Sequence, residues 1–330
     1  MAPGLELLKS EARAFKSNAF AVATKKSYNT HLMTFIRFCL FYDLTPVPAS
    51  QETITCYVAH LARSLKPVSV NIYLNIIRIM HEEAGFPNPL FENYELRMIK
   101  RGLLRERGSP PVQKAPMTVA ILISLYKNVN FDLCSERAFW CALLLGFFGF
   151  LRKSSLIPSS TAVPLNKRLN RADVIDLKLD SFSLVCAHSK TNQFGQRTHV
   201  IPYATCSDRR LCPVYALLSH LGASPLQSHV PLFNYCVRSR DTFYSHAAFV
   251  ARLKAGVKQC GLDPSQVSCH SLRRGGATLS FQSGLSAEHI KMRGDWRSSC
   301  YQQYLVISPE SSMSVARTLS KTAAGMSLTL

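Results

Sequence analysis

A proline- and glycine-rich stretch interrupts the helical periodicity of the 330-residue chain about a third of the way along it. The stretch reads GSPP at positions 108–111, and KAP follows at 114–116. Proline lacks a backbone donor and disfavours helix in the residue before it, so regular structure does not cross this segment. The sequence therefore predicts a linker over residues 108–117, between one domain over residues 1–107 and a second over residues 118–330.

Apolar residues of the first domain recur at the spacing of amphipathic helices in four segments. Thr24 is expected to cap the first of these helices, and Ser50 precedes the second. The third segment includes residues 70–77, and the fourth spans residues 91–107. Four short helices of this kind form a small bundle, so the first domain is predicted to be all helical.

Basic residues lie four positions apart in the last of these helices, which aligns them along one face. Such a stripe is suited to the phosphates of a DNA backbone, although a solvated helix face explains the stripe alone equally well. The candidate DNA-binding residues of the first domain are Lys25, Lys26, Arg97, Lys100, Arg101 and Arg105.

The second domain combines helical patterns with short strands. Its most apolar run covers residues 138–151, which is too short to span a bilayer and indicates a buried core helix. Apolar segments at 173–177 and 182–187, followed by Gly195 and a third segment at 198–202, are typical of an antiparallel sheet with a hairpin. The fold class expected for the chain is therefore mainly α, with a small antiparallel β-sheet.

The chain is strongly basic, with 39 lysines and arginines against 20 acidic residues and a formal net charge of +19. Residues 1–113 contain 14 basic and 9 acidic residues, whereas residues 114–330 contain 25 and 11. A polyanion is therefore the expected partner, and the second domain carries most of the excess charge.

Eleven cysteines are scattered along the chain without a Cys-x-x-Cys pair, and the N-terminus does not resemble a secretory signal. This pattern is typical of a reduced intracellular protein, nuclear if the host is eukaryotic. Cysteines and histidines do not cluster at the spacing of zinc ligands. The sequence thus predicts neither a metal nor another cofactor, and no membrane segment.

Two basic residues of the second domain occupy unusual local positions. Arg152 follows the apolar run directly, where an unpaired buried guanidinium is costly, so this arginine must be paired or face a site. The alternative is an arginine that donates to the last carbonyls of a helix. Lys190 lies where the second strand enters the hairpin, a place where a lysine is usually only a solubilising charge.

Two further features lie nearer the C-terminus. His270 and Arg273 are three residues apart near the start of a helix, which places both on one face beside the partial positive charge of the helix N-terminus. Trp296 follows a Gly-Asp turn and precedes Tyr301 and Tyr304. Its indole N–H can only donate and suits a phosphate oxygen, although such aromatic residues are by default part of a core.

Each of these features is weak alone, but their order along the chain resembles that of the tyrosine recombinase (phage integrase) family, to which Cre and lambda integrase belong. Residues 20–107 are similar to the SAM-like core-binding domain of that family, and residues 118–308 to its catalytic domain. The stretches 150–156, 189–195 and 294–305 look closest to recombinases of the Crypton and DIRS types of eukaryotic mobile element. The matching positions are Arg152, Lys190, His270, Arg273, Trp296 and Tyr304.

The resemblance implies a site-specific DNA recombinase or integrase that acts on double-stranded DNA. Tyr304 would be the nucleophile and would form a 3′-phosphotyrosyl link. Because the pentavalent transition state is highly charged, Arg152 and Arg273 would hold its non-bridging oxygens. The link conserves the phosphodiester energy, so neither ATP nor a metal is needed.

The other matched residues would move protons or add hydrogen bonds. His270 and Trp296 would donate to the phosphate, and His270 would also help to remove the tyrosine proton. Lys190, on a mobile hairpin, would protonate the leaving 5′-oxygen. Such enzymes work as dimers or tetramers on paired sites, and the tail over residues 310–330 is expected to pack onto a neighbouring protomer.

Two departures from the family pattern leave alternatives open. Ser155 stands where many members carry an acidic residue, and the distance from Trp296 to Tyr304 is one residue shorter than in Cre, which keeps Tyr301 as a second candidate nucleophile. A recombinase-derived DNA-binding protein that no longer cuts, and an enzyme like the type IB topoisomerases, are the alternative functions.

Overall fold

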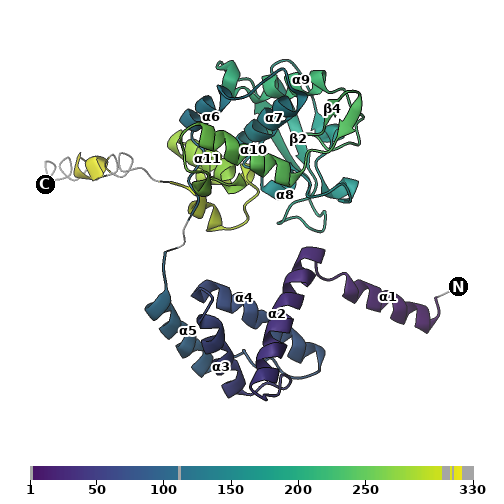
Figure 1. The fold of residues 1–330 in the computed structure, drawn as a ribbon, viewed down its shortest axis with the longest axis vertical. Helices are drawn as coiled ribbons and strands as arrows, with labels where there is room; N and C mark the ends of the chain where they lie inside the picture. The colour runs from purple at the N-terminus through teal and green to yellow at the C-terminus, as the bar shows by residue number, and fades with distance from the viewer. Residues whose placement is uncertain (1–2, 111–112, 307–312, 314–315, 322–330) are drawn as a thin grey trace, which may run out of the picture. The chain divides into compact units, whose positions relative to one another are not determined.

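The computed structural model describes residues 3–110, 113–306, 313 and 316–321. The chain divides into two compact units, residues 1–112 and residues 113–330 (Figure 1). The described part of the first unit is helical, with the helices α1 (Leu5–Ser17), α2 (Val22–Phe41), α3 (Gln51–Ala62), α4 (Pro67–Glu83) and α5 (Tyr94–Arg107).

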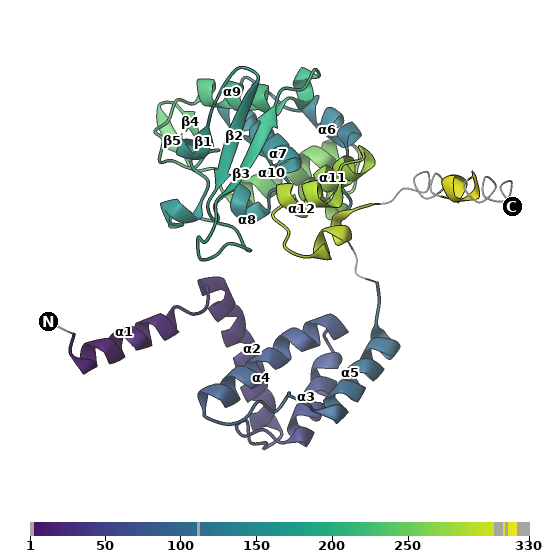
Figure 2. The ribbon, with the colours of Figure 1, turned by 180° about the vertical axis from the view of Figure 1, so that it is seen from behind.

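Helices α2 to α5 form the bundle of the first unit, as Figure 2 shows. Phe35, Ile54, Tyr57 and Ile77 are fully buried between them. The remaining helix, α1, has no buried residue, and the sequence analysis did not predict it. Its apolar residues Leu5, Leu8 and Phe15 nevertheless recur at helical spacing, so this helix could have been predicted from its stripe.

The ends of these helices confirm one predicted cap and contradict another. Ser50 accepts a hydrogen bond from the backbone N–H of Thr53 and caps α3 as expected. The prediction that Thr24 caps α2 is wrong, because that helix begins at Val22 after an extended Ala21. The helix extends beyond its apolar stripe, so Thr24 lies inside the first turn.

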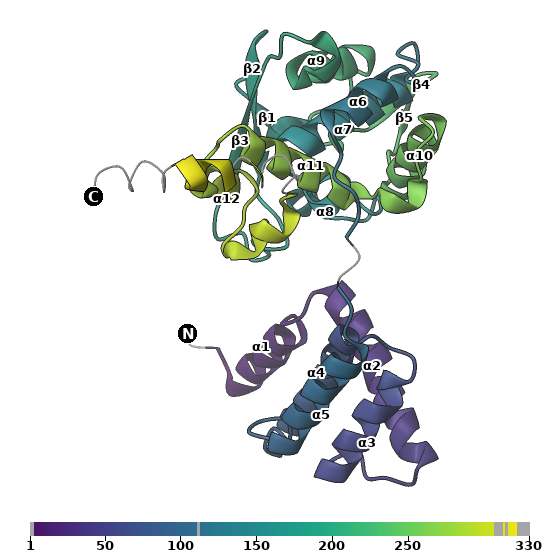
Figure 3. The same cartoon turned by 90° about the vertical axis from the view of Figure 1, so that its left-hand side faces the viewer.

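The second unit is built around α7, with the described helices and strands α6 (Val119–Tyr126), α7 (Cys134–Phe148), α8 (Lys153–Leu156), η1 (Leu165–Lys167), η2 (Arg171–Asp173), β1 (Val174–Ile175), β2 (Ser181–Cys186), β3 (His199–Ala204), η3 (Arg209–Leu211), α9 (Pro213–Ala223), β4 (Tyr235–Val237), β5 (Arg240–Thr242), α10 (His246–Gln259), η4 (Pro264–Gln266), α11 (Cys269–Gln282), α12 (Ala287–Arg293) and η5 (Ser299–Tyr304). Figure 3 shows the three-stranded sheet on one side of α7 and α10 on the other. Contacts on both sides agree with this arrangement: the Tyr203 hydroxyl donates to the Leu145 carbonyl at 2.9 Å, and the Phe139 and Phe249 ring centroids are 5.5 Å apart.

The sheet has the order β1-β2-β3 with antiparallel pairing throughout, and Leu184 faces Ile201 in the register. Alternate residues of β2 are buried, which is the pattern of a sheet with one face on the core. The expected fold class, mainly helical with a small antiparallel sheet, is confirmed. The short hairpin of β4 and β5 was not predicted, because strands of three residues are too short to show a period of two.

A close approach between α11 and α7 positions the functional residues discussed below. At Gly276 a Cβ atom would lie 2.1 Å from the Phe147 carbonyl oxygen, so only glycine allows the two helices to come this near. The N-terminal half of α11 therefore lies against the end of α7. In the described part of the chain, no helix has both the length and the apolar character required to cross a membrane. The tail predicted to contact a neighbouring protomer lies largely outside the described residues.

Candidate active site

The first candidate arginine lies in the turn that follows α7. Phe150 adopts a left-handed backbone conformation, with φ of 49°, and redirects the chain so that Arg152 becomes the N-cap residue of α8. Arg152 is half-buried, and its Nη1 donates to the Thr191 hydroxyl at 3.4 Å. This is the one hydrogen bond of its guanidinium within the described residues, so Arg152 does not cap the carbonyls of the preceding helix. Most of its N–H groups remain free for a ligand.

Arg273, on the first turns of α11, is almost completely buried, with 2% of its surface exposed. Its Nη1 donates to the Phe150 carbonyl, and its Nη2 donates to the Gly294 carbonyl at 2.6 Å. Burial and the nearby Arg152 cation lower the pKa of Arg273. The guanidinium contacts no carboxylate within the described residues and still has unused N–H groups. A buried group of this kind is suited to an anionic ligand.

Trp296 forms the floor beneath this guanidinium. The Arg273 Cζ atom lies 3.7 Å from the centroid of the indole, a cation–π contact. The indole reaches this place because Gly294 has no side chain: a Cβ atom there would lie 1.9 Å from Trp296 Cζ3. The indole N–H, predicted to donate to a phosphate, makes no hydrogen bond within the described residues, which leaves it available for that role.

The two candidate tyrosines lie one turn apart on the 3-10 helix η5, in which residues three apart are eclipsed. Tyr301 is 9% exposed and packs in an apolar cluster with Phe150 and Trp296. Tyr304 is half-buried at the edge of that cluster. Its ring centroid is 5.2 Å from that of Trp296 and 5.3 Å from Arg273 Cζ.

The backbone of Tyr304 is tethered to α11. Its carbonyl accepts a hydrogen bond from the Thr278 hydroxyl at 3.2 Å, and the same hydroxyl accepts from the Val306 N–H at 3.1 Å. Thr278 is 6% exposed. The sequence analysis missed this residue, because nothing in its local pattern indicates a partner 26 residues further along the chain.

His270 lies next to Tyr304 at the start of α11, with 6.4 Å between their ring centroids. The ring is accessible to solvent, yet the surrounding protein removes part of its hydration, and this effect together with the Arg273 and Lys153 cations lowers its pKa. The neutral form of His270 is therefore favoured near pH 7. A neutral imidazole beside a phenol is suited to accept its proton.

Lys190 lies on the hairpin between β2 and β3 and is exposed. Its ammonium group makes no hydrogen bond or ion pair within the described residues, whereas its backbone carbonyl accepts from Gln193 Nε2 at 3.0 Å. Lys190 is also among the cations that lower the pKa of His270, and the neighbouring Ser189 lines the same small hollow as Arg152 and Arg273. The structure thus brings together all six candidate positions of the second unit.

Asp295 is a member of this site that the sequence analysis identified only as part of a turn. It is 8% exposed, with φ of 54°, and forms an ion pair with Arg197 at 2.5 Å. Its carboxylate also accepts from the Ser189 hydroxyl at 2.8 Å and from the Thr191 hydroxyl. The sequence signal for such a role is faint: an aspartate after glycine is usually only a turn residue.

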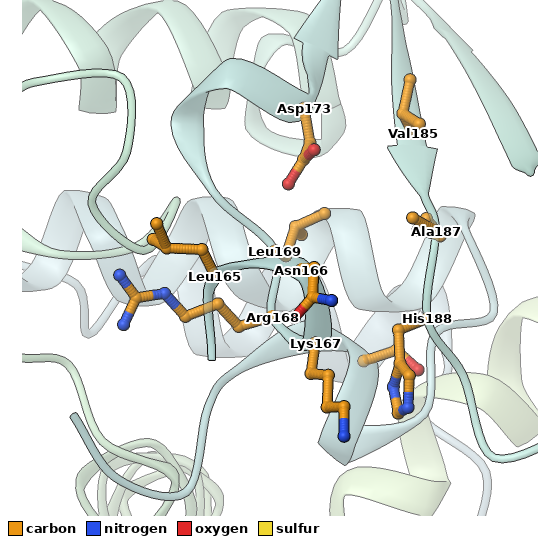
Figure 4. A pocket seen from close by; sticks show the side chains of 11 residues that line it. Leu165, Asn166, Lys167, Arg168, Leu169, Asp173, Val185, Ala187 and His188 are labelled. Atoms are coloured by element: carbon orange, nitrogen blue, oxygen red, sulfur yellow. The ribbon is translucent and has the colours of Figure 1, made fainter. Parts of the chain in front are cut away.

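A hollow beside the site is lined by residues of η1 and of the end of β2, and Figure 4 shows Lys167 and His188 pointing the same way within it, with Asp173 at the other end. Neither the Lys167 ammonium nor the His188 ring has a hydrogen-bond partner within the described residues. Arg168, by contrast, ties the segment together by donating to the His229 carbonyl at 3.1 Å and the Asn170 side chain at 2.9 Å. Ser155 lines both this hollow and the one that contains Arg152.

The candidate DNA-binding residues of the first unit lie on α2 and α5. Lys25 and Lys26 are exposed in the first turns of α2. On α5 the buried Leu96 faces the bundle. The four candidates on this helix are exposed, except for Lys100, which is half-buried. Within the described chain none of the six forms an ion pair. The candidates on α5 are Arg97, Lys100, Arg101 and Arg105.

Comparison with known proteins gives one similar curated sequence and many similar structures. No family model matches the chain. An integrase/recombinase XerD homolog of Selenomonas ruminantium is 29% identical over 290 residues, which cover 85% of this chain and 79% of that protein.

Two solved structures illustrate the similarity in fold. A fragment of lambda integrase, solved as a dimer bound to a COC′ core site, has a TM-score of 0.59 at 15% identity and covers 90% of this chain and 93% of its own. The integrase of transposon Tn1549, solved with transposon right end DNA, has a TM-score of 0.59 at 12% identity and covers 94% and 98%. The chain is thus similar in sequence to an integrase/recombinase, and it shares its fold with integrases of known structure.

Proposed function

We propose that this chain is a site-specific recombinase or integrase whose nucleophile is Tyr304. The observation that carries the proposal is the difference between the two tyrosines of η5. Tyr304 is half-buried beside Arg273 and His270, whereas Tyr301 packs in the apolar cluster with 9% of its surface exposed. A nucleophile must reach a DNA phosphate, so the accessible phenol is the better candidate.

In this proposal the two arginines stabilise the charge that develops on the scissile phosphate. Arg152 and Arg273 approach from different elements, α8 and α11, and both retain unused N–H groups. The backbone carbonyls of Phe150 and Gly294 fix the Arg273 fork before DNA arrives, so its orientation requires little reorganisation during the reaction. The Trp296 N–H adds a further donor.

Proton transfers accompany both ends of the displacement. Neutral His270 accepts the phenol proton as the Tyr304 oxygen attacks phosphorus, and the P–O bond to the 5′-oxygen breaks. The Lys190 ammonium donates a proton to that leaving oxygen. The products are a 3′-phosphotyrosyl bond and a free 5′-hydroxyl, and attack by a 5′-hydroxyl of another strand reverses the step.

The arrangement of basic side chains supports binding of double-stranded DNA by both units. We assign the region over residues 1–107 as the core-binding domain and that over 118–330 as the catalytic domain, joined by a linker over 108–117. The exposed basic face of α5 and the pair of Lys167 and His188 are suited to DNA phosphates.

The assembly, the host and the location follow from the same proposal. The lambda integrase fragment was solved as a dimer on DNA, and we expect this chain to self-associate on paired sites. The stretches around Arg152, Lys190 and Trp296 resemble those of the Crypton and DIRS recombinases of eukaryotic mobile elements, and we propose an origin of that kind. A protein of that origin acts on chromosomal DNA in the nucleus.

The decisive experiment traps the covalent intermediate. A pool of duplexes with a randomised segment and a fixed nick releases a short oligonucleotide on cleavage, which leaves the protein joined to DNA. We expect adducts that survive SDS, in the presence of EDTA, and mass spectrometry of the digested adduct should locate the DNA on Tyr304.

Two matched variants test the assignment of the nucleophile. Removal of the phenol hydroxyl deletes the nucleophile with little change in packing, so Tyr304→Phe should form no adduct and Tyr301→Phe should retain it. The opposite pattern would assign the reaction to Tyr301. Binding of the pool without any adduct from the wild-type chain would instead indicate a DNA-binding protein that no longer cuts.

A further inference from the structure

Asp295 is the one acidic residue that lines the small hollow between the two arginines. The other lining residues include the Arg152 and Arg273 cations, so the carboxylate lies in a cationic environment. Burial disfavours its charged form, but the Thr191 and Ser189 hydroxyls and the Arg197 cation outweigh this effect and lower the pKa of Asp295. The group is therefore an anion at neutral pH.

All of the side chains that hydrogen-bond or ion-pair with this carboxylate belong to the hairpin that carries Lys190. Ser189 and Thr191 flank the lysine directly, and Arg197 lies on the returning arm. One carboxylate thus holds both arms of the hairpin. The Lys190 ammonium itself makes no hydrogen bond or ion pair within the described residues, so its position is set by its neighbours in the chain.

The residues on either side of Asp295 hold the buried arginine. Gly294 accepts from Arg273 Nη2 through its carbonyl, and Trp296 lies under the guanidinium. Asp295 adopts the left-handed conformation that aspartate and asparagine tolerate better than most residues. Gly294 and Trp296 therefore contact Arg273, and Asp295, which lies between them in the chain, binds the hairpin.

We propose that Asp295 is a positioning residue that fixes the Lys190 hairpin relative to Arg273, so that the lysine is aligned with the leaving 5′-oxygen while the arginine holds the same phosphate. This inference rests on the proposed function and adds a residue to its machinery. Loss of the carboxylate charge should release the hairpin and slow proton donation, while the arginine and the nucleophile stay in place.

Asp295→Asn is the first test, because asparagine has the same shape and tolerates the same backbone conformation. We expect cleavage of ordinary DNA to slow by about 10- to 100-fold, within the range that a general acid contributes. DNA affinity should be unchanged. A substrate with a 5′-bridging phosphorothioate, whose sulfur leaves without a proton, should restore the rate to near that of the wild type.

Asp173→Asn is the matched control. Asp173 is another partly buried aspartate beside the same sheet, but its partner is Asn170 and not the hairpin. This variant should lack a defect that the phosphorothioate rescues. Arg197→Gln removes the other end of the ion pair and should give the Asp295→Asn defect in weaker form, again with rescue.

Hydrogen exchange gives a readout that does not depend on catalysis. Amides of residues 189–197 should exchange faster in Asp295→Asn than in the wild type, whereas those of α11 should not change. Unchanged exchange in the hairpin, or a cleavage defect that the phosphorothioate does not rescue, would overturn the proposal. Failure of the wild-type chain to form any adduct would refute the proposed function alone, since the exchange experiment still tests the hairpin restraint.

Discussion

The two arginines of the site are predicted to differ sharply in what their removal does to the fold. Arg273→Ala deletes two charged hydrogen bonds to backbone carbonyls and a desolvated contact with Trp296. Hydrogen bonds to a charged group contribute about 1.5–3 kcal/mol each, and a desolvated cation–π contact contributes about 2 kcal/mol. The gross loss is about 5–8 kcal/mol, and the desolvation cost of the buried guanidinium, several kcal/mol, offsets part of it.

The net destabilisation expected for Arg273→Ala is therefore about 2–4 kcal/mol, since two carbonyls are also left without a donor. For a domain of this size the melting temperature falls by about 2–4 °C per kcal/mol, which gives a decrease of about 5–15 °C. Arg152→Ala loses one hydrogen bond at 3.4 Å from a half-buried side chain, so less than about 1 kcal/mol is expected.

The assay combines stability with chemistry. Urea unfolding followed by circular dichroism gives the free energy of unfolding, and the trapped-adduct assay gives cleavage. Both variants should lose the adduct, because both arginines act on transition-state charge, and Arg152→Ala should retain the DNA affinity of the wild type. Equal destabilisation by the two substitutions would refute the reasoning. The prediction requires that Arg273 stabilises the fold through its protein contacts, whereas the Arg152 side chain has few protein contacts and its donors are free for the ligand.

Three further predictions concern proton transfer and DNA binding. Lys190→Ala should slow cleavage of ordinary DNA and be rescued by the 5′-bridging phosphorothioate, and a rescue that fails would argue against a general acid at this position. Because the pKa of His270 is lowered, its neutral form should persist below pH 6.5, and the cleavage rate should fall only as the ring becomes protonated at lower pH. His270→Gln should abolish that acidic limb of the pH–rate profile, and a limb that survives belongs to another group. Finally, the double variant Arg101→Ala with Arg105→Ala should reduce the slope of log affinity against log salt by about two, while Lys127→Ala, chosen as a control in the other unit, should leave the slope unchanged.

Features that depend on nearest neighbours in the chain were predictable from the sequence. Helices α2 to α5 follow from their apolar stripes, and Ser50 caps α3 because an N-cap bond joins residues only three apart. The sheet follows from its short apolar segments and from Gly195 in the hairpin. Thr24 failed as a cap because the start of a helix depends on how far the chain continues beyond its apolar stripe.

Features that depend on contacts between distant segments were not predictable. Ser189 and Asp295 are 106 residues apart in sequence, and Tyr304 and Thr278 are 26 apart. The burial of Arg273 is also hidden in its helix pattern, because an arginine three residues after a histidine looks like part of a polar face. The order of the motif residues indicated which side chains meet, whereas the groups that hold them in place required the coordinates.

The arrangement of these supports separates the parts of the site that are fixed from those that remain free. Arg273 is bound to the backbone on both sides, and Tyr304 is tethered by its own carbonyl, so the proposed phosphate pocket and the base of the proposed nucleophile are set by the fold. The Lys190 ammonium and most of the Arg152 donors have no protein partner within the described residues. A site divided in this way can bind the phosphate in a fixed orientation and leave the proton donor to be placed by the hairpin. For that reason the contact to test is the one between Asp295 and the hairpin, and not a bond to Lys190 itself. Its loss should slow proton transfer and leave DNA binding unchanged.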